Sequence, residues 1–325
     1  MPGLDVGKIW LDKTERRLLL GRGQFSHVHR GKLNGSKEVA IKWIVVENQP
    51  EAGYNQIAAI KQDTQRSKRE DEALRQLDHP NIIKLLHVEE ENSIKYFALE
   101  LCAATLHQYC MRRYNGPMPP VAVVLLHIVR GLRHVHCKGF AHRNIEPKNI
   151  LISKSFPTRI LLSDFGLSKS VSNLSGSYSV SQDRSINQDG QLLWLAPELL
   201  DNPDDQGFSE KRGSIASDTF SAGCVFFFYL TLGWHPFGSR LDSIYMNILN
   251  GKPVILRYLP EEQHRFKSTI EAMILKKPED RISLEQVENN LQEIIGPYLF
   301  EPETESIRIP DDGEDGQDER PDWLM

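Results

Sequence analysis

The first hundred residues carry short-period hydrophobic patterns that predict strands. Alternating and β-branched runs of this kind occupy residues 18–46, 82–88 and 94–101. We expect one helix among them, over 68–77, where Ala73, Leu74 and Leu77 recur at helical spacing. The polar stretch 47–67 before this helix is expected to be a loop with some helix.

From residue 103 onward the hydrophobic spacing becomes helical. We expect helices over 106–113, 121–138, 216–232, 241–250, 262–275 and 283–294, with a loop-rich region from 139 to about 200. Strands first and helices later predict an α+β fold with two lobes. The N-terminal lobe is expected to be small and β-rich, and the C-terminal lobe larger and helical.

Composition changes this picture only at the C-terminal end. The chain has 325 residues, of which 40% are hydrophobic and 26% charged, as is ordinary for a soluble globular protein. Residues 301–325 hold ten acidic and two basic side chains, net −8, so the rest of this chain of net charge −5 carries about +3. We therefore expect a disordered acidic tail over 297–325, which either keeps the protein soluble or binds a basic partner.

Several functional classes have no support in the sequence. The net charge gives no argument for binding nucleic acid or an anionic membrane. The longest apolar run, 222–232, is too short to span a bilayer, and no signal peptide is evident. The four cysteines lack metal-ligand spacing and a dense disulfide pattern, so we expect a reducing, cytoplasmic compartment.

A glycine-bearing turn between two predicted strands is the first candidate binding element. Residues 20–28, LGRGQFSHV, resemble the glycine-rich loop of protein kinases, G-x-G-x-x-G-x-V, with a serine at the third glycine position. Glycines let backbone amides approach phosphate oxygens closely, although the same segment also fits a plain β-turn. The candidate nucleotide contacts in this segment are Gly21, Arg22, Gly23, Ser26 and Val28.

A lysine and a glutamate form the second candidate element. Lys42 ends the sequence VAIK, 39–42, which resembles the kinase strand whose lysine contacts the α- and β-phosphates, and Ala40 is a further candidate nucleotide contact. Glu70 lies nine residues before the sequence HPN, at the spacing of the helix glutamate that pairs with this lysine in kinases. We prefer Glu70 to the neighbouring Glu72 as the partner of Lys42.

The stretch 142–149, HRNIEPKN, resembles the kinase catalytic loop H-R-D-L-K-P-x-N with two changes. Asn144 replaces the aspartate that accepts the substrate hydroxyl proton, and Glu146 replaces the lysine that lies near the transferred phosphate in the family. Asn149 keeps the position of the magnesium-binding asparagine, and Asp164, in SDFG, matches the magnesium-binding aspartate of D-F-G. The candidate catalytic residues are thus Lys42, Glu70, Asn144 and Glu146, and the candidate metal ligands are Asn149 and Asp164.

Three further matches are expected to hold the fold and do no chemistry. Glu198 lies in the sequence APE, Asp218 is at a predicted helix start, and Arg281 is placed to pair with Glu198. Seven motifs occur in the expected order over about 240 residues, which excludes a chance origin. The chain is identified as resembling the protein kinase superfamily, which implies the two-lobed kinase fold and the binding of ATP or ADP with Mg²⁺.

The segment 166–191 is rich in serine. It is either a flexible polar loop or an activation loop whose phosphorylated serines pair with Arg143. Gln191, at its end, replaces the threonine that in Ser/Thr kinases bonds the missing aspartate and lysine. Three partners of one catalytic constellation have therefore changed together.

A closer resemblance points to the kinase domain of the inositol-requiring kinase/endoribonuclease, a sensor of the unfolded-protein response. The segments that carry it include VGKI (6–9), ELCAATL (100–106), NILIS (149–153) and FSAGCVF (220–226). The likeness covers roughly residues 6–290. It implies that Leu99 is the gatekeeper and that Glu100, Leu101 and Cys102 form the hinge whose backbone meets the adenine. We expect no lumenal region, membrane span or ribonuclease module in this chain.

The resemblance also suggests a division of the chain. An N-terminal leader is expected over 1–14, the N-lobe with its glycine-rich loop and long helix over 15–102, and the C-lobe with its catalytic and activation loops over 103–296. The acidic tail, 297–325, follows.

These motifs lead to three functional hypotheses. We expect a nucleotide-binding pseudokinase or severely impaired Ser/Thr kinase that signals through conformation and through a homodimer or a kinase partner. The amide of Asn144 cannot carry away a proton, and general-base assistance is typically worth about 10²–10⁴ in rate. The first alternative is an active Ser/Thr kinase, because much of phosphoryl transfer rests on positioning and charge. The second is an interaction scaffold that needs no nucleotide, although scaffolding alone does not require the retained ATP and metal positions.

Overall fold

Seven strands of the N-terminal region form one antiparallel sheet. The computed structural model describes residues 4–12, 15–22, 26–46, 54–170, 190–200 and 214–296. The sheet order is β1-β2-β4-β5-β7-β6, and β3 pairs with β4 outside this path. The strands are β1 (Leu4–Val6), β2 (Ile9–Leu11), β3 (Leu19–Arg22), β4 (Ser26–Leu33), β5 (Lys37–Val45), β6 (Leu85–Glu91) and β7 (Ile94–Leu99).

Each face of this sheet contributes side chains to an apolar cluster, because successive side chains of a strand point to opposite sides. On β7, Tyr96 and Ala98 pack into a small apolar cluster with residues of β1, β2, β4 and β5. Phe97 and Leu99 point the other way and join the main core. The strands expected over 18–46 and 94–101 are thereby confirmed as β3 to β5 and β7.

Two strands of this sheet were not predicted, and one strand prediction needs correction. The β1–β2 hairpin lies within the expected leader, 1–14, and its Val6, Ile9 and Leu11 are buried in the small cluster. These strands have three residues each, too few for a period-two pattern to be recognised. The strand expected at 82–88 begins only at Leu85. The apolar residues before it, such as Ile83, instead bond the backbone of Leu162 in the other lobe.

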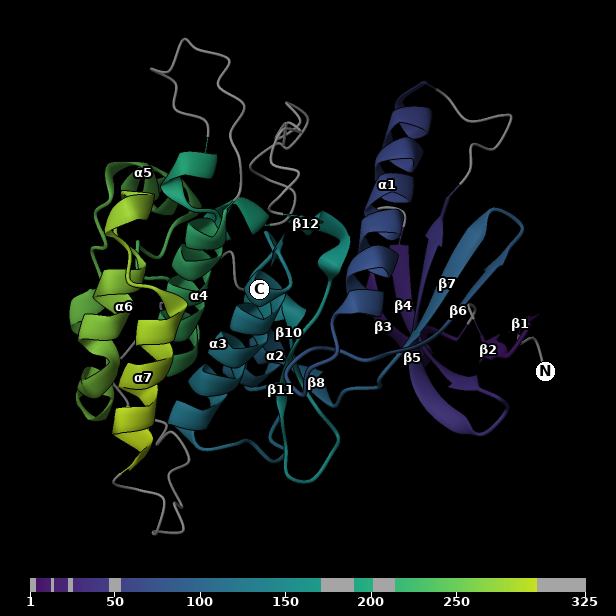
Figure 1. The fold of residues 1–325 in the computed structure, drawn as a ribbon, viewed down its shortest axis with the longest axis horizontal. Coiled ribbons are helices and arrows are strands. Elements are labelled where there is room, and N and C mark those ends of the chain that lie inside the picture. The colour runs from purple at the N-terminus through teal and green to yellow at the C-terminus, as the bar shows by residue number, and fades with distance from the viewer. Residues whose placement is uncertain are drawn as a thin grey trace, which may run out of the picture.

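The helix α1 (Tyr54–Gln76) is much longer than expected, because the loop predicted over 47–67 is helical from Tyr54. Its buried face includes Asp63, Ser67 and Glu70, followed by apolar residues near the C-terminal end. A helix face made of polar side chains leaves no hydrophobic period in the sequence, which is why the prediction missed it. The helix packs against β5 and against the turn Phe165–Leu167, on the side of the sheet that faces the second lobe (Figure 1).

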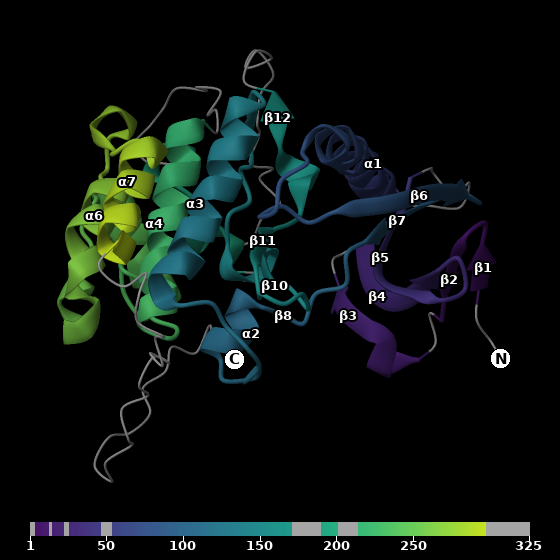
Figure 2. The same ribbon diagram turned by 60° about the horizontal axis from the view of Figure 1, so that its bottom comes forward.

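The C-terminal lobe is helical, as predicted (Figures 1 and 2). Its helices are α2 (Leu106–Cys110), α3 (Val121–Cys137), α4 (Ile215–Leu230), α5 (Leu241–Asn250), α6 (Lys267–Met273) and α7 (Leu284–Ile295). The helix α4 forms the centre, since 14 of its 16 residues are buried. The helix expected over 262–275 is shorter, because a 3-10 segment, Glu261–Phe266, precedes α6. The acidic tail lies outside the described residues.

Short strands lie where the two lobes meet (Figure 2). β8 (Ala104–Thr105), β10 (Ile150–Ile152) and β11 (Ile160–Leu162) form one small sheet, and β9 (Phe140–Ala141) pairs with β12 (Lys169–Ser170). In the β10–β11 pair, Ile150 is opposite Leu162. The residue before β10, Asn149, and the residues after β11, Ser163 and Asp164, therefore emerge side by side. No described helix is long and apolar enough to cross a membrane.

Candidate functional site

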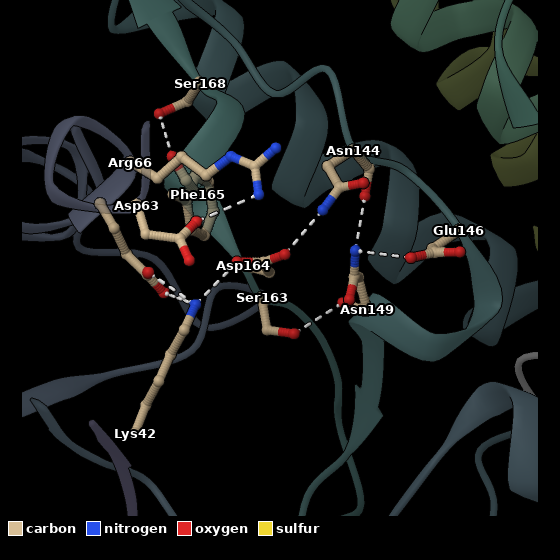
Figure 3. Close-up of polar contacts among 11 residues, drawn as sticks. Lys42, Asp63, Arg66, Asn144, Glu146, Asn149, Ser163, Asp164, Phe165 and Ser168 are labelled. Carbon is tan, nitrogen blue, oxygen red and sulfur yellow. Dashed lines mark hydrogen bonds and ion pairs between the residues drawn. The ribbon is translucent and has the colours of Figure 1, made fainter. Parts of the chain in front are cut away.

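Lys42 lies at the meeting point of three elements. It is on the face of β5 that points towards α1, and its Nζ donates to both carboxylate oxygens of Glu70, at 2.8 and 2.6 Å. The same Nζ donates to Asp164 Oδ1 at 2.8 Å (Figure 3). Glu72 on the same helix is exposed. The structure thus pairs Lys42 with Glu70 and brings Asp164 of the other lobe to the same ammonium group.

Burial sets the electrostatics of this group. The Lys42 side chain is 13% exposed and that of Glu70 is 2% exposed. Burial opposes the charge on Lys42, but the Asp164 and Glu70 carboxylates outweigh it and raise the pKa of Lys42 above its usual value. For Asp164, burial acts to raise the pKa, but the Lys42 ammonium beside it prevails and lowers that pKa. Burial raises the pKa of Glu70, which shares the single ammonium with Asp164. A cation between two carboxylates is a stable arrangement at neutral pH.

Asp218 holds the catalytic-loop backbone in place. Its carboxylate accepts hydrogen bonds from the backbone N–H groups of His142, at 2.8 Å, and Arg143, at 2.7 Å. His136 Nε2 lies 2.9 Å from the same carboxylate. Arg143 has a φ of +68°, in the left-handed region that is strained for a residue with a side chain. Asp218 lies in the first turn of α4 and is 1% exposed, so a buried helix start fixes the path of this loop.

The two changed residues of the loop both accept hydrogen bonds from Asn149. The Asn144 side-chain amide donates from Nδ2 to Asp164 Oδ2 at 2.6 Å. Asn149 Nδ2 donates to the Asn144 backbone oxygen at 3.0 Å and to Glu146 Oε1 at 3.3 Å (Figure 3). A continuous set of polar contacts therefore runs from Lys42 through Asp164 to Glu146.

The β10–β11 hairpin fixes Asp164 relative to Asn149. Ser163 donates from both its backbone N and its Oγ to the Asn149 backbone oxygen, each at 2.9 Å. Asp164 then takes a left-handed conformation, φ +64° and ψ +75°, which turns its carboxylate towards Lys42. The next residue, Phe165, is fully buried and its ring lies 4.6 Å from that of His142.

The donor set at this point fits a magnesium ion held with a nucleotide. Asn149 uses its amide NH₂ on Asn144 and Glu146, so its Oδ1 is the side-chain atom left for a ligand. The Asp164 carboxylate supplies hard oxygen atoms beside it. Mg²⁺ is commonly held by one or two such groups, with phosphates and water completing its shell. When bound, the ion would neutralise phosphate charge. Three His, Cys, Asp or Glu side chains do not gather into a metal site within the described ranges.

The remaining candidate nucleotide contacts outside the hinge lie on strands β3, β4, β5 and β7 of the N-terminal sheet, except for one that is not described. Gly21 and Val28 are opposite one another in the β3–β4 pair, and Arg22 follows on β3, whereas Gly23 lies outside the described residues. Ser26 begins β4. Ala40 lies on β5 on the same side as Lys42, and Leu99 is opposite it in the β5–β7 register.

The segment that joins the lobes is held by its side chains as well as its backbone. Glu100 accepts a hydrogen bond from Arg159 at 2.8 Å, and its backbone N–H donates to Lys84. Burial raises the pKa of Cys102 to about 12, so its thiol is protonated at neutral pH. The Glu198–Arg281 pair expected to support the fold is formed by two hydrogen bonds of 2.7 Å.

Sequence reasoning missed two residues of α1 near this site. Asp63 and Arg66 lie two turns and one turn, respectively, before Glu70 and bond each other at 3.3 Å (Figure 3). Burial raises the pKa of Asp63, against the effect of Arg66 and Lys42. The spacing of seven and four residues before Glu70 is the signal that would have found them, had the helix been extended correctly.

Lys148, the lysine of the catalytic-loop stretch 142–149, lies apart from the contacts that join Lys42, Asp164 and Asn149. It is exposed and lies near His107 of α2; burial and this lysine together lower the pKa of His107 to about 4. The side chain of Gln191 and most of the serine-rich segment, 171–189, lie outside the described residues.

Comparison with known proteins places the chain in a family. The protein kinase domain model matches residues 14–291. The chain is 35% identical over 293 residues to the serine/threonine-protein kinase/endoribonuclease IRE2 of Homo sapiens, covering 87% of this chain and 28% of the relative. It is 31% identical to the kinase/endoribonuclease ire-1 of Caenorhabditis elegans, covering 84% and 26%. It is also 31% identical to the sensor for unfolded proteins in the ER of Schizosaccharomyces pombe, covering 81% and 25%.

The chain spans about a quarter of the length of these relatives. The range matched by the protein kinase domain model, 14–291, contains the residues of the site described above. The resemblance to the kinase portion of this group is thereby confirmed over most of the chain, and so is the two-lobed α+β fold. The chain belongs to the protein kinase domain family.

Proposed function

We propose that this chain is a nucleotide-binding kinase domain with weak or absent phosphotransfer, which signals through conformation. ATP or ADP with Mg²⁺ would bind between the lobes, close to Lys42, Asn149 and Asp164. The bound state would then favour a homodimer or the binding of a kinase partner, because a ligand shifts a protein towards the conformation that it binds better. We place this function in the cytoplasm, where thiols stay reduced.

The observation that carries the proposal is the chemistry of the Asn144 side chain. Its Nδ2 donates to Asp164 Oδ2 at 2.6 Å, at the position where a kinase needs a carboxylate to accept the substrate proton. An amide does not take up a proton near neutral pH. Since general-base assistance contributes typically about 10²–10⁴ in rate, its loss alone would make the domain a poor phosphotransferase.

Glu146 supports the same conclusion. Its carboxylate accepts a hydrogen bond from Asn149, one of the two proposed metal ligands, and so lies close to where the terminal phosphate would be. In the family this position holds a lysine. At an effective dielectric constant near 20, two like charges about 4 Å apart repel by roughly 4 kcal/mol before a metal ion offsets them.

The contacts of Lys42 support nucleotide binding over a nucleotide-independent scaffold. A buried ammonium group held between Glu70 and Asp164 is costly to desolvate, and a scaffold has no need of it. In kinases this lysine, its glutamate and the D-F-G aspartate act together on the phosphates and their metal ion. Their assembly here also keeps an active kinase as the second candidate, because positioning alone supplies much of phosphoryl transfer.

The test is transfer of the γ-phosphate from labelled ATP in the presence of Mg²⁺. The unmodified chain would be compared with Asn144→Asp/Glu146→Lys and with Asp164→Ala, and nucleotide binding would be measured on each by calorimetry. We expect nucleotide binding by the unmodified chain, with transfer only in the restored double variant. Activity of the unmodified chain that disappears in Asp164→Ala would instead identify an active kinase. Absence of nucleotide binding would favour the scaffold.

Regulation by phosphorylation is a separate part of the proposal. The serine-rich segment 166–191 would act as an activation loop, and Arg143, the neighbour of Asn144, would pair with a phosphoserine in it. Mass spectrometry of the protein from its native cells tests this directly. An unmodified segment under all growth and stress conditions would contradict the regulatory role and leave a polar loop.

A further inference from the structure

The Asp164 carboxylate is bonded on both oxygens by groups of the chain itself. Oδ1 accepts from Lys42 Nζ at 2.8 Å, and Oδ2 accepts from Asn144 Nδ2 at 2.6 Å (Figure 3). The second bond has a neutral N–H donor and a charged acceptor, which makes it stronger than a bond between neutral groups. Among the described contacts of Asp164, one donor therefore comes from each lobe.

The identity of residue 144 decides whether its side chain attracts or repels the Asp164 carboxylate. An aspartate there would place a carboxylate at hydrogen-bond distance from the carboxylate of Asp164. Two carboxylates so close cannot both ionise favourably unless a proton or a cation lies between them. The asparagine replaces an oxygen anion by an N–H donor of nearly the same size and shape. Repulsion that a divalent cation would have to offset becomes attraction that needs no cation.

The Asn144 contact also reaches the elements that form the nucleotide site. Its backbone oxygen accepts from Asn149, and the Asn149 backbone oxygen accepts two hydrogen bonds from Ser163, next to Asp164. Through Lys42, Asp164 is joined to Glu70 and hence to α1. The inward position of Asp164, the buried Phe165 and the docked helix are thus supported by one connected set of bonds.

We propose that Asn144 is a positioning residue that performs part of the structural role of a divalent cation. Nucleotide binding by this domain accordingly depends less on Mg²⁺ than it would with aspartate at position 144. The inference rests on the proposed nucleotide binding. It adds an explanation of how the nucleotide site tolerates the loss of Mg²⁺. It concerns binding and conformation, and it does not depend on whether phosphotransfer survives.

The experiment measures the ADP dissociation constant by isothermal titration calorimetry, once with MgCl₂ and once with EDTA. The ratio of the two constants, EDTA over MgCl₂, is the metal factor of a variant. It is compared between the unmodified chain, Asn144→Asp and Asn144→Ala. Asn115→Asp makes the same chemical change at an exposed position between α2 and α3, so it controls for the added charge.

We expect the metal factor of Asn144→Asp to exceed that of the unmodified chain at least fivefold, and that of Asn115→Asp to be unchanged. Asn144→Ala loses the donor without adding a charge, so its metal factor is expected to lie between the two. A merely structural role of Asn144 would weaken ADP binding equally with and without metal. A difference below fivefold between the unmodified chain and Asn144→Asp overturns the inference and leaves the proposed nucleotide binding intact.

If no variant binds ADP in either condition, the proposed function fails, and hydrogen exchange then tests the positioning role of Asn144 separately. Exchange of the backbone amides over 163–168 would be followed with and without MgCl₂ in the unmodified chain and in Asn144→Asp. Protection that responds to MgCl₂ only in Asn144→Asp supports the role of Asn144. An equal response of the two proteins overturns it.

Discussion

At the scale of residues, the hydrogen bonds of the Asn149 side chain fix which of its atoms can bind a ligand. Because its NH₂ group bonds Asn144 and Glu146, its Oδ1 is the side-chain atom left for a ligand. Glu146 thereby has two effects: it orients the proposed metal ligand, and it would bring a negative charge beside the phosphates of a bound nucleotide. A lysine at position 146 could not accept the Asn149 hydrogen bond, so this contact is specific to the changed loop.

The charge of Glu146 leads to a prediction about nucleotide preference. Removing it in Glu146→Gln should raise the affinity for ATP about tenfold, or about 1.4 kcal/mol, while the affinity for ADP changes by less than about threefold. The reason is that the charge next to Asn149 acts most strongly on the terminal phosphate, which only ATP carries. Calorimetric titration of both nucleotides with MgCl₂ gives the two ratios. Glu271→Gln, at an exposed position on α6, is the matched control, and an equal gain for ATP and ADP would contradict the prediction.

At the scale of elements, the buried face of α1 changes along its length, from polar side chains to apolar ones near the C-terminal end. The helix is held to the sheet by Lys42 through Glu70 and by Lys95 through Asp71, at 2.7 Å. Nearer its start, the buried Ser67 has no hydrogen-bond partner for its Oγ among the described residues. A helix that docks through polar groups is held less tightly than one with an apolar stripe, which suits an element whose position is linked to the site.

This hydroxyl gives a stability prediction for α1. Ser67→Ala should raise the free energy of unfolding by about 1 kcal/mol, because it removes a buried polar group without a partner and adds a strong helix former. Chemical denaturation at neutral pH measures the change. Ser168→Ala is the contrasting variant, since Ser168 Oγ donates to the Phe165 backbone oxygen at 2.6 Å and its loss should destabilise the protein. A destabilised Ser67→Ala would indicate a partner for this hydroxyl.

The accuracy of the sequence-based prediction differs from one element to another. Helices α3 and α7 were predicted within two residues at each end, because an apolar face repeats along each of them. Helix α4 was predicted equally well from its nearly continuous apolar run. The start of α1 was not predictable in this way. The motifs named the individual residues of the site, but the contact between Asn144 and Asp164 depends on the register of β10 with β11. Residues 139–200 were expected to be loop-rich, so neither strand of this pair was predicted and their register could not be.

At the scale of the whole molecule, Lys42 and Asp164 join the two lobes. Lys42 comes from β5 of the N-terminal lobe, and Asp164 follows β11 at the edge of the C-terminal lobe. Arg159 makes another connection near the hinge, bonding the Pro80 backbone oxygen and Glu100, and the Ile83 backbone bonds Leu162. The position of one lobe relative to the other therefore depends in part on charged groups, so it should respond to pH as well as to nucleotide.

The last prediction concerns the loss of the cation at this junction. Lys42→Met leaves the Glu70 and Asp164 carboxylates close together without an ammonium group. Breaking a buried ion pair typically costs about 3–5 kcal/mol, and we expect roughly 3 kcal/mol because Asp164 is 35% exposed. The lowered pKa of Asp164 means that its ion pair stabilises the fold above the usual value of 3.8 and is lost as the pH falls through the lowered pKa. The raised pKa of Lys42 means that its contribution is present below the usual value of 10.5 and is lost only as the pH rises through the raised pKa.

The difference in unfolding free energy between the unmodified chain and Lys42→Met should accordingly be greatest from about pH 5 to pH 10 and should shrink below about pH 4. Denaturant titrations across this range measure it, with Lys252→Met, at an exposed position after α5, as the control. A difference that stays constant into the acid range would show that Lys42 stabilises the molecule by packing its methylene groups. In that case the charges would not be what holds the two lobes together, and the proposed link between nucleotide binding and lobe arrangement would have to run through the hinge.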